Sequence, residues 1–514
     1  MTRGEIPERY NASLLLDSNL EAGRGGKVAI HWADAEVTYS ELFDRMCKSG
    51  RALAELGVNP GDRVLMVLDD RPEFPAIFLG AIRAGAVPVP VNPLYDPEDY
   101  AYFVKDSEAR ILIVDPARAD KLRAALGGSA GELEILTTGG PIDGLPSFDE
   151  VLAGHSGDLS PVGTHRDDMA FWLYSSGSTG SPKGVVHLQH DILSTCESYA
   201  KHALKIEQSD LTFSSTKLFH AYGLGNNLSF PYWAGASTVL LSGRPTPDAL
   251  FETIERFKPT LFFSVPTLYN AVLNSPGAEN KDVSSVRACV SAAEPLPAEV
   301  WHRWKKVFDL VILDGIGSTE LLHIYCSNTL DDHVPGSSGK PVPGYELEIR
   351  GDNDEVLHGE AQGNLYVKGE SALAYYWNKP DKTEECLRDG WFFSGDRYRR
   401  DSEGYYWYEG RADDMFKVSG LWVSPAEVEG ALLEHPSVVE AAVVGISVEG
   451  FTNAKAFVIP GDPRSADDSL KQDLATFCEK RLHRYQQPRI IEFVDDLPRT
   501  ITGKIQRFKL REAG

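Results

Sequence analysis

Short, uninterrupted apolar runs recur along this chain up to about residue 320, and they constrain its fold more than any other feature. Continuous runs of this length are typical of strands that are covered on both faces, as in parallel sheets. Helical stretches separate the runs, such as Tyr39–Leu56, which begins with a capping-box pattern from Thr38 to Glu41. The alternation predicts an α/β fold with a parallel sheet. The runs are Arg63–Leu68, Ala109–Val114, Met169–Tyr174, Thr238–Leu241, Leu261–Ser264 and Val311–Leu313.

The pattern changes twice in the last third of the chain. Gly363–Val367 and Gly404–Tyr408 predict antiparallel strands or a small barrel. Further on, Ser424 begins a helix, with Pro near the first helical position. A strand over Val438–Val444 and a helix over Ser469–Arg484 follow, which predicts a compact α+β unit at the end of the chain.

A chain of 514 residues is too long for one compact core, since domains average about 150 residues. The changes of pattern predict a large N-terminal domain over 1–410, with sheet subdomains to about 335 and a β-rich, barrel-like part over about 336–410. The remaining residues, 411–514, form a small α+β C-terminal domain of ordinary size.

The chain carries a net charge of −24 at pH 7. Such a surface repels nucleic acid and anionic membranes, so neither is an expected partner. No apolar run approaches the roughly 18 residues that span a bilayer, and the N-terminus is charged where a signal peptide is apolar. The six cysteines form no CxxC pair, which argues against a zinc site or a disulfide framework. We therefore expect a cytoplasmic protein with reduced thiols.

The run that ends at Tyr174 leads into a loop rich in glycine, serine and threonine, YSSGSTGSPKG over 174–184. Backbone N–H groups in such a turn form a nest for an anion, and a lysine adds a point charge. A helix over about 191–203 follows, so strand, loop and helix predict a phosphate-binding loop. A Walker A loop needs Ser or Thr after its lysine, whereas Gly184 follows here, so a P-loop NTPase is disfavoured. The predicted phosphate-binding residues are Ser176, Gly177, Ser178, Thr179, Gly180 and Lys183.

This loop resembles the phosphate-binding motif of the adenylate-forming superfamily, which includes acyl- and aryl-CoA ligases, peptide-synthetase adenylation domains and firefly luciferase. Four further stretches resemble other motifs of the superfamily, in the same order. Five ordered resemblances across most of the chain make coincidence negligible. The four are Gly315–Glu320 for the second nucleotide motif, Ser394–Asp396 for the ribose-binding segment, Gly410–Gly420 for the hinge and crossover motif, and Pro498–Lys504 for the catalytic-lysine motif.

The resemblance implies a reaction in which ATP activates a carboxylate. Attack of the carboxylate on the α-phosphate gives an acyl-AMP, from which a thiol displaces AMP. Two anions meet in the first step, so donors that stabilise the developing charge contribute on the order of 10²–10³ in rate apiece. The expected cofactors are ATP and Mg²⁺, with coenzyme A as the thiol substrate, and no protein nucleophile is expected.

Individual residues take their roles from this resemblance. It implies that Glu320 ligates Mg²⁺, which prefers oxygen ligands, and that Thr319 contacts the α-phosphate. Asp396 accepts hydrogen bonds from the ribose hydroxyls, and Arg411 contacts ribose or phosphate. Lys504 reaches the carboxylate and the α-phosphate during adenylation. The residues that match the adenine slot are Ala293, Glu294, Pro295, Asp314, Gly315 and Ile316.

The superfamily also implies a mobile C-terminal domain. Asp413 matches the hinge position, where a few residues absorb the rotation that carries Lys504 away after the first step. The segment around Gly420 then lines a tunnel for the pantetheine thiol, and a glycine there permits close approach of the ligand chain.

Within the superfamily, the closest resemblance is to benzoate–CoA ligases, on the segments 171–180, 185–190, 217–226 and 317–324. A pocket for an aromatic acid should be mostly apolar. Glycines at 223, 225 and 317 would leave room for a flat ring. The expected pocket residues are His220, Ala221, Tyr222, Gly225, Ile316, Gly317, Leu322, His323 and Ile324. The alternative for His323 is that it only packs inside the protein.

One departure from the benzoate pattern is His220, which stands after Phe219 where those enzymes commonly carry an aromatic pair. A histidine can donate to a carboxylate or to a ring hydroxyl, and such a contact discriminates strongly between substrates. This favours a hydroxylated aryl acid such as ortho-hydroxybenzoate, with a bicyclic hydroxynaphthoate also open. The alternative is that His220 is the aromatic gate that is widely used in the superfamily.

The sequence thus predicts an aryl acid–CoA ligase. A stand-alone adenylation enzyme that loads a carrier protein remains an alternative, because both enzymes form the aryl-AMP. A non-catalytic nucleotide-binding protein is a third reading, but it would not need Lys504 and a hinge as well as the loop. The ring substituents, a homodimer, and a biosynthetic or catabolic pathway stay open.

Overall fold

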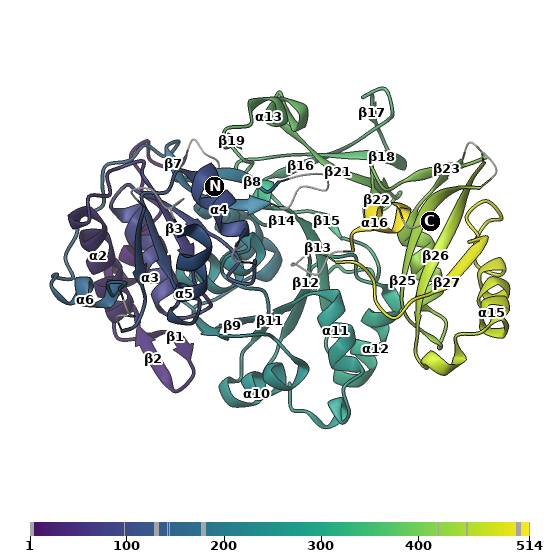
Figure 1. Cartoon of the computed structure of the whole chain (residues 1–514), viewed down its shortest axis with the longest axis horizontal. Helices are drawn as coiled ribbons and strands as arrows, with labels where there is room; N and C mark the ends of the chain where they lie inside the picture. The colour runs from purple at the N-terminus through teal and green to yellow at the C-terminus, as the bar shows by residue number, and fades with distance from the viewer. Residues whose placement is uncertain are drawn as a thin grey trace.

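The computed structural model describes residues 5–96, 98–127, 133–140, 142, 144–175, 181–419, 421–448, 451–499 and 505–512. A large N-terminal α/β domain and a small C-terminal domain lie side by side along the longest axis of the molecule (Figure 1). The predicted fold class is confirmed.

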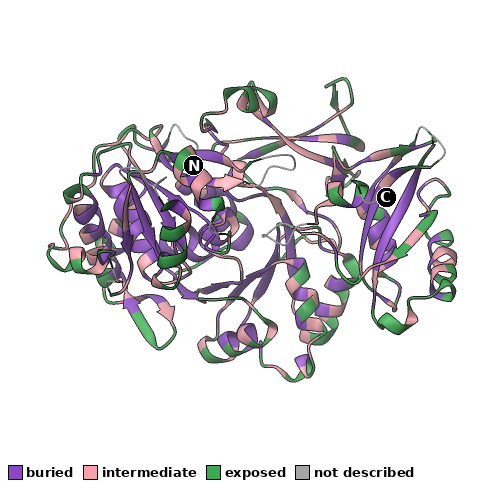
Figure 2. Ribbon diagram, in the orientation of Figure 1, coloured by how far each residue is buried: buried purple, intermediate pink, exposed green. Residues whose placement is uncertain are grey.

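A nine-stranded sheet forms the middle of the large domain, in the order β15-β14-β13-β12-β11-β9-β10-β1-β2. The six strands from β1 to β13 along this order are parallel, and antiparallel strands close both edges. Because the strands are buried, the apolar runs of the sequence lie inside the protein (Figure 2). The strands are β1 (Val28–Trp32), β2 (Ala35–Thr38), β9 (Leu211–Ser214), β10 (Ser237–Leu240), β11 (Leu261–Ser264), β12 (Ala288–Ser291), β13 (Ile312–Gly317), β14 (Ile324–Ser327) and β15 (Lys340–Pro341).

Two smaller sheets complete the α/β part. A parallel sheet has the order β4-β3-β5-β6, and an antiparallel one has the order β19-β8-β7. Their strands are β3 (Arg63–Val67), β4 (Val87–Pro90), β5 (Ile111–Val114), β6 (Glu134–Thr137), β7 (Met169–Ser175), β8 (Lys183–Leu188) and β19 (Tyr375–Tyr376).

The strand β7 corrects one prediction. The apolar run Met169–Tyr174 predicts a strand of a parallel sheet, but β7 pairs antiparallel with β8, a strand that was not predicted. An apolar run cannot distinguish the two arrangements, because β7 is covered on both faces. Phe171 packs into one hydrophobic cluster and Trp172 into another. The helix predicted over about 191–203 is confirmed, as α7 followed by η3.

The helices of the large domain cover these sheets. The predicted capping box is confirmed, since the Thr38 side chain accepts from the Glu41 N–H and the Glu41 carboxylate accepts from the Thr38 N–H. The helices are α1 (Leu14–Glu21), α2 (Tyr39–Glu55), α3 (Glu73–Arg83), α4 (Asp99–Ser107), α5 (Pro116–Leu126), α6 (Phe148–Ala153), α7 (Asp191–Thr195), α8 (Ala221–Leu224), α9 (Phe230–Ala234), α10 (Pro247–Phe257), α11 (Pro266–Leu273), α12 (Ala298–Phe308) and α13 (Pro380–Cys386), with π-helices η3 (Cys196–Leu204) and η4 (Gly225–Ser229) and 3₁₀ turns η5 (Ala278–Asn280) and η6 (Thr319–Leu321).

The β-rich part is an antiparallel sheet in the order β17-β16-β18-β21-β20, with β22 also paired to β21. This order is that of an open sheet rather than a closed barrel. Its strands are β16 (Tyr345–Arg350), β17 (Val356–Leu357), β18 (Ala361–Gly369), β20 (Leu387–Arg388), β21 (Trp391–Arg400) and β22 (Tyr406–Arg411).

The C-terminal domain has its own hydrophobic clusters. Within the described part of the chain, each cluster of buried apolar residues lies entirely before or entirely after residue 411. No helix in the described ranges is long and apolar enough to cross a membrane. The elements of this domain are β23 (Phe416–Val418), β24 (Leu421–Val423), α14 (Pro425–Leu433), β25 (Val438–Val448), β26 (Phe451–Pro460), η7 (Pro463–Ser465), α15 (Asp468–Glu479), β27 (Ile490–Phe493) and α16 (Arg507–Glu512).

Candidate active site

A lysine, a tyrosine and a glutamate from three separate segments form a row at the end of the predicted phosphate-binding loop. Lys183 is the first residue of β8, directly after the loop, and its ammonium lies 4.3 Å from the centre of the Tyr376 ring. The Tyr376 hydroxyl donates to Glu320 Oε1 at 2.9 Å. Burial raises the pKa of Tyr376, so the phenol keeps its proton and remains a donor. The row joins the predicted phosphate lysine to the predicted metal ligand.

The two ends of the loop are braced by α4. Tyr174 donates to Asp106 Oδ2 at 2.8 Å just before the loop, and Tyr102 donates to the Pro182 carbonyl at 2.5 Å just after it. Lys379 donates to Asp106 Oδ1 at 3.3 Å. The predicted phosphate-binding residues Ser176, Gly177, Ser178, Thr179 and Gly180 lie outside the described residues, as do Gly420 and Lys504.

Thr319 and Glu320 occupy the 3₁₀ turn η6, directly after β13. The turn is capped at its start by the Ser318 hydroxyl, which accepts from the Leu321 N–H at 3.2 Å. It ends at Leu322, whose φ of 65° reverses the chain into β14. The sharp reversal leaves both predicted nucleotide contacts half-buried on a short, closed turn.

Glu320 fits the role of a magnesium ligand. A carboxylate oxygen is a hard donor, and Mg²⁺ is usually held by one or two carboxylates together with substrate phosphates rather than by an all-protein cage. The part of the chain that the structure describes holds no group of three His, Cys, Asp or Glu side chains that could bind a metal.

The residues predicted for the adenine slot lie at the carboxyl ends of β12 and β13, where ligands commonly bind in α/β sheets. Ser291 and Asp314 are neighbours across the two strands. Burial raises the pKa of Asp314 well above its usual range, and its Oδ1 has no hydrogen-bond partner among the described residues. Glu294 is already engaged, because its carboxylate accepts from the Thr267 N–H at 3.1 Å and hydroxyl at 2.6 Å. Ala293 and Pro295, on either side of it, are exposed.

Asp396 and Arg411 face each other across β21 and β22. Arg411 Nη1 donates to Asp396 Oδ1 at 3.3 Å and to the Ser394 carbonyl at 3.1 Å. The guanidinium Nε also lies 3.5 Å from Asp413 Oδ1. The predicted ribose contacts and the predicted hinge residue thus form one polar cluster at the start of the C-terminal domain.

The predicted aromatic pocket is assembled from α8, η4 and the β13–β14 hairpin. Its centre is the buried ring of His323, which packs against Tyr199, Tyr222 and Phe230 with ring centres 5.1, 5.5 and 4.5 Å away. His323 Nε2 lies 3.1 Å from Asn226 Oδ1. Burial lowers the pKa of His323 to about 3, so the ring is neutral at physiological pH.

The other predicted pocket residues adjoin this ring. Leu322 and Ile324 are buried, Ile316 is half-buried, and Gly317 pairs with Ile324 across the hairpin. Ala221 is buried at the start of α8, and Tyr222 donates from its hydroxyl to the Val290 carbonyl at 3.1 Å.

His220 is the N-cap of α8, at the edge of this region. It is half-buried, and its ring centre lies 4.5 Å from that of Phe219. The two histidines therefore lie in different environments, since His323 is fully enclosed and His220 is partly accessible. The sequence analysis expected both of them at one pocket.

The glycines of the pocket serve packing within the chain. A Cβ at Gly225 would lie 2.3 Å from the His323 ring, and one at Gly317 would lie 2.6 Å from the His323 carbonyl oxygen. A Cβ at Gly223 would lie 2.1 Å from the Lys217 carbonyl oxygen. The positions beside these glycines are filled by the protein itself, whereas the sequence analysis reserved them for a substrate ring.

Sequence reasoning gave no role to several residues that hold the site together, namely Tyr376, Asp106, His187 and Asp191. His187 lies inside β8, for which no strand was predicted, and Asp191 is the first residue of the predicted helix, so neither gave a local signal for a role in the site. Tyr376 has no local signal, because its partner Glu320 is 56 residues away in the sequence.

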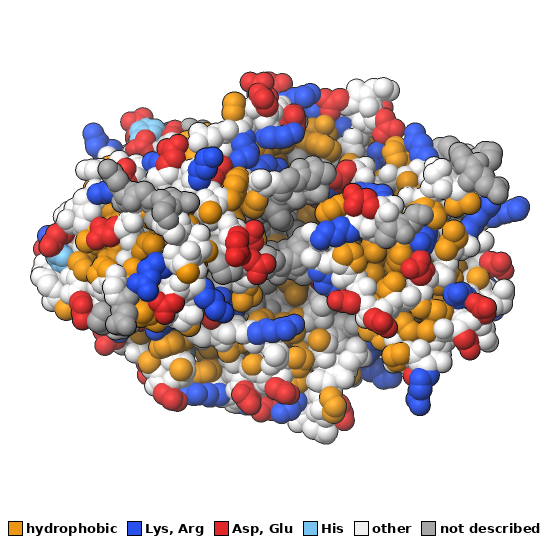
Figure 3. Space-filling model, in the orientation of Figure 1, with side chains coloured by type: hydrophobic (Ala, Val, Ile, Leu, Met, Phe, Trp, Pro, Cys, Tyr) orange, Lys and Arg blue, Asp and Glu red, His pale blue; other side chains and the backbone are white. Residues whose placement is uncertain are grey.

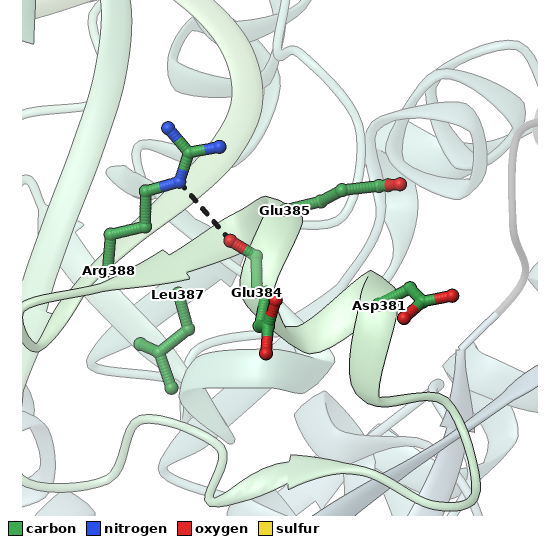
Figure 4. A pocket seen from close by; sticks show the side chains of 5 residues that line it. All are labelled: Asp381, Glu384, Glu385, Leu387 and Arg388. Carbon is green, nitrogen blue, oxygen red and sulfur yellow. Dashed lines mark hydrogen bonds between the residues drawn. The ribbon is translucent and has the colours of Figure 1, made fainter.

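Two surface depressions lie away from this centre. One is lined by Asp381, Glu384, Glu385, Leu387 and Arg388 (Figure 4), where Arg388 Nε donates to the Glu384 carbonyl at 3.2 Å. Its three carboxylates make it a poor place for a phosphate. The other lies in the C-terminal domain and includes the guanidinium groups of Arg484 and Arg489. Its residues are Val418, Ser419, Asn453, Ala454, Arg484, Tyr485, Gln487 and Arg489. Acidic and basic side chains are interspersed over the face of the molecule that Figure 3 shows.

The chain belongs to the AMP-binding enzyme family. The family matches residues 18–377, and the AMP-binding enzyme C-terminal domain matches residues 427–504. The large domain with the loop and η6, and the small domain after it, are thus both accounted for by this family.

Several of the proteins that are similar to this chain are aryl-CoA ligases. The chain is 47% identical to benzoate–CoA ligase of Thauera aromatica, over 99% of this chain and 97% of that protein. Its fold is similar to the anthranilate CoA ligase AuaEII, solved in complex with anthranoyl-AMP, with a TM-score of 0.95 and 40% identity over 100% of this chain and 99% of that one. A benzoate CoA ligase from Burkholderia xenovorans has a TM-score of 0.90 and 41% identity over 98% of this chain and 100% of that chain.

Proposed function

We propose that this protein is an aryl acid–CoA ligase. In the first step a carboxylate oxygen attacks the α-phosphorus of ATP, and diphosphate leaves. In the second step the thiol sulfur of coenzyme A attacks the acyl carbon, AMP leaves, and the thiol gives up its proton. The row of Lys183, Tyr376 and Glu320 carries the proposal, since a cationic group and a carboxylate held together at the end of this loop would suit ATP and its metal ion.

In this scheme the protein's own groups hold and orient the nucleotide. Lys183 and the loop bind phosphate oxygens, and Asp396 accepts from the ribose hydroxyls beside Arg411. Glu320 would hold Mg²⁺, which supplies charge neutralisation on the phosphate oxygens. Lys504 would approach the carboxylate and α-phosphate during adenylation, and Thr319 would contact the same phosphate. Oriented charges of this kind stabilise the transition state more than the ground state.

We place the domain boundary at 410/411, with Asp413 as the hinge. The separate hydrophobic clusters on the two sides support this division. Coenzyme A is the proposed acceptor, because Arg484 and Arg489 line a depression together with Ser419, and guanidinium groups there would suit the phosphates of the nucleotide part. A cytoplasmic location and a homodimer remain predictions.

The proposed substrate is a small aromatic carboxylic acid, unsubstituted or hydroxylated. A panel of acids with ATP, Mg²⁺ and coenzyme A, read by mass spectrometry, tests this directly. The panel should hold benzoate, the three hydroxybenzoates, 2-aminobenzoate, a hydroxynaphthoate and acetate. Aryl-CoA is the expected product. Aryl-AMP that accumulates with coenzyme A present, but is consumed by a carrier protein, would instead support the carrier-loading alternative.

His220 can be tested within the same panel. If it donates to the substrate, His220→Phe should shift the preference from hydroxylated acids toward benzoate, because loss of the donor removes discrimination in favour of a hydroxyl. An unaltered profile would leave His220 as an aromatic gate.

A further inference from the structure

Two buried side chains, His187 and Asp191, contact the turn that carries Thr319 and Glu320. Both side chains have 0% exposure. His187 Nε2 lies 2.8 Å from the Thr319 carbonyl oxygen, and His187 Nδ1 lies 2.8 Å from Asp191 Oδ2. A carbonyl oxygen only accepts, so Nε2 carries a proton and donates it to Thr319.

The orientation of the His187 ring is determined on its edge and on its face. On the edge, Asp191 Oδ2 is the hydrogen-bond partner of His187 Nδ1. The same oxygen accepts from the Leu188 N–H at 3.0 Å, which fixes the position of the carboxylate. Phe171 stacks on the ring face, with centres 5.3 Å apart and planes 26° apart. A ring held in this way can direct Nε2–H only toward η6.

The opposite side of η6 is held by the segment that leads to β19. The Leu373 N–H donates to the Glu320 carbonyl at 2.7 Å, and the Ser371 hydroxyl donates to the Leu321 carbonyl at 2.8 Å. Tyr376 holds the Glu320 side chain from the same segment. All three carbonyls of the turn therefore accept a hydrogen bond from outside it, and His187 supplies the one at Thr319.

We infer that His187 is a positioning residue for adenylation, with Asp191 fixing its orientation. His187 touches neither nucleotide nor metal in this scheme. It holds the Thr319 backbone so that the Thr319 hydroxyl and the Glu320 carboxylate stay directed at the phosphates. The inference rests on the proposed function, because the roles of Thr319 and Glu320 belong to it. Substitution of a residue that orients a metal-binding side chain typically lowers activity or metal affinity by about 10–100-fold.

A pair of substitutions separates the Thr319 contact from general packing. In His187→Gln the amide nitrogen takes the place of Nε2 and can still donate to Thr319. In His187→Asn the amide takes the place of Nδ1, so the contact with Asp191 is kept and the one with Thr319 is lost. Both variants remove the ring from Phe171, so their packing costs are similar.

Three measurements apply to each variant: aryl-acid-dependent ATP–diphosphate exchange, thioester formation from supplied aryl-AMP and coenzyme A, and Mg²⁺-dependent binding of a non-hydrolysable ATP analogue by calorimetry. We expect His187→Asn to lower exchange by about 10–100-fold and to weaken Mg²⁺-dependent binding by about tenfold, while thioester formation changes less than about threefold. His187→Gln should keep exchange within about fivefold of the wild type.

His435 provides a matched control. It is also a buried histidine beside an aspartate, with Nε2 lying 3.2 Å from Asp473 Oδ2, but it lies in the C-terminal domain. His435→Gln should leave exchange unchanged.

Equal losses in the Gln and Asn variants, or equal losses in the two half-reactions, would overturn the inference in favour of a purely structural role. If His187→Asn does not fold, Asp191→Asn replaces it in the test. We then expect a loss of exchange without a loss of thioester formation. A wild-type protein without exchange for any aryl acid would refute the proposed function instead.

Discussion

The Thr319–Glu320 turn and the C-terminal domain are held in contrasting ways. Each carbonyl of the turn accepts a hydrogen bond from a neighbouring segment, and its main supports are buried. The C-terminal domain has separate hydrophobic clusters, and its contacts with the large domain include polar ones, such as the Arg397 guanidinium 5.0 Å from the Trp422 ring. The difference suits a reaction in which the nucleotide site stays fixed while the domain that carries Lys504 changes position.

The largest effect is expected at Lys504. Lys504→Ala should lower adenylation by about 10²–10³-fold, since it removes a charge that acts on the developing transition state. Thioester formation from supplied aryl-AMP should remain, because the second step does not need this lysine. The two half-reactions, assayed separately, check this. Unchanged overall turnover would contradict the assignment of Lys504 to adenylation. The contrast between a fixed turn and a moving C-terminal domain would then have no functional meaning.

A loss of about 100-fold in adenylation is expected for Glu320→Gln, with a higher Mg²⁺ concentration needed for half-maximal rate. Tyr376→Phe removes only the hydrogen bond to the Glu320 carboxylate, so about tenfold is expected. Mg²⁺ titrations of the exchange rate measure both. If the two variants showed the wild-type Mg²⁺ dependence, the turn would not be the metal-ligating region.

The second step should be sensitive at position 420. Gly420→Leu should slow thioester formation by roughly tenfold through obstruction of the thiol path, while adenylation is spared. Gly430→Leu is a matched control in the same domain, because a Cβ at Gly430 meets nothing within 4 Å. Equal damage to both steps by the Gly420 variant would argue against a tunnel there.

A smaller effect is expected from the brace around the phosphate-binding loop. Asp106→Asn weakens the contacts with Tyr174 and Lys379, so the KM for ATP should rise by about fivefold while kcat changes little. Asp99→Asn, on the exposed face of the same helix, is the control. A fall in kcat at unchanged KM would show that the brace acts on the chemical step rather than on nucleotide binding.

The smallest effect concerns stability in acid. The folded-state pKa of His323 is about 3 and the ordinary value is 6.5, so the unfolded chain binds more protons between these values. This residue therefore lowers stability as pH falls below 6.5, by at most about 1.4 kcal/mol per pH unit. His323→Gln keeps a donor for Asn226 and should flatten the pH dependence of denaturant unfolding between pH 5 and 6.5. An identical slope would mean that folding does not lower the pKa of His323.

The class of the fold and the order of the motifs could be predicted because both depend on local patterns. The capping box at Thr38 and the strand Leu261–Ser264 follow from neighbouring residues alone, and the structure confirms both. The direction of β7 could not be predicted, since a strand covered on both faces reads the same in parallel and antiparallel sheets.

The hydrogen bonds that hold the candidate site in place could not be predicted from local sequence patterns. Glu320 is steadied by Tyr376, and Thr319 by His187, 132 residues away along the chain. The glycines at 225 and 317 lie close to the His323 ring and backbone, and in the sequence a small residue looks the same whether it makes room for a ligand or for such a neighbour. Tertiary contacts alone distinguish the two cases.

The most direct test of the account is exchange of labelled diphosphate into ATP in the absence of coenzyme A. Benzoate or a hydroxybenzoate should drive exchange in the wild-type protein with Mg²⁺, and Lys504→Ala should lower the exchange rate by about 10²–10³-fold. A folded wild-type protein that binds ATP but shows no exchange with any aromatic acid would contradict it.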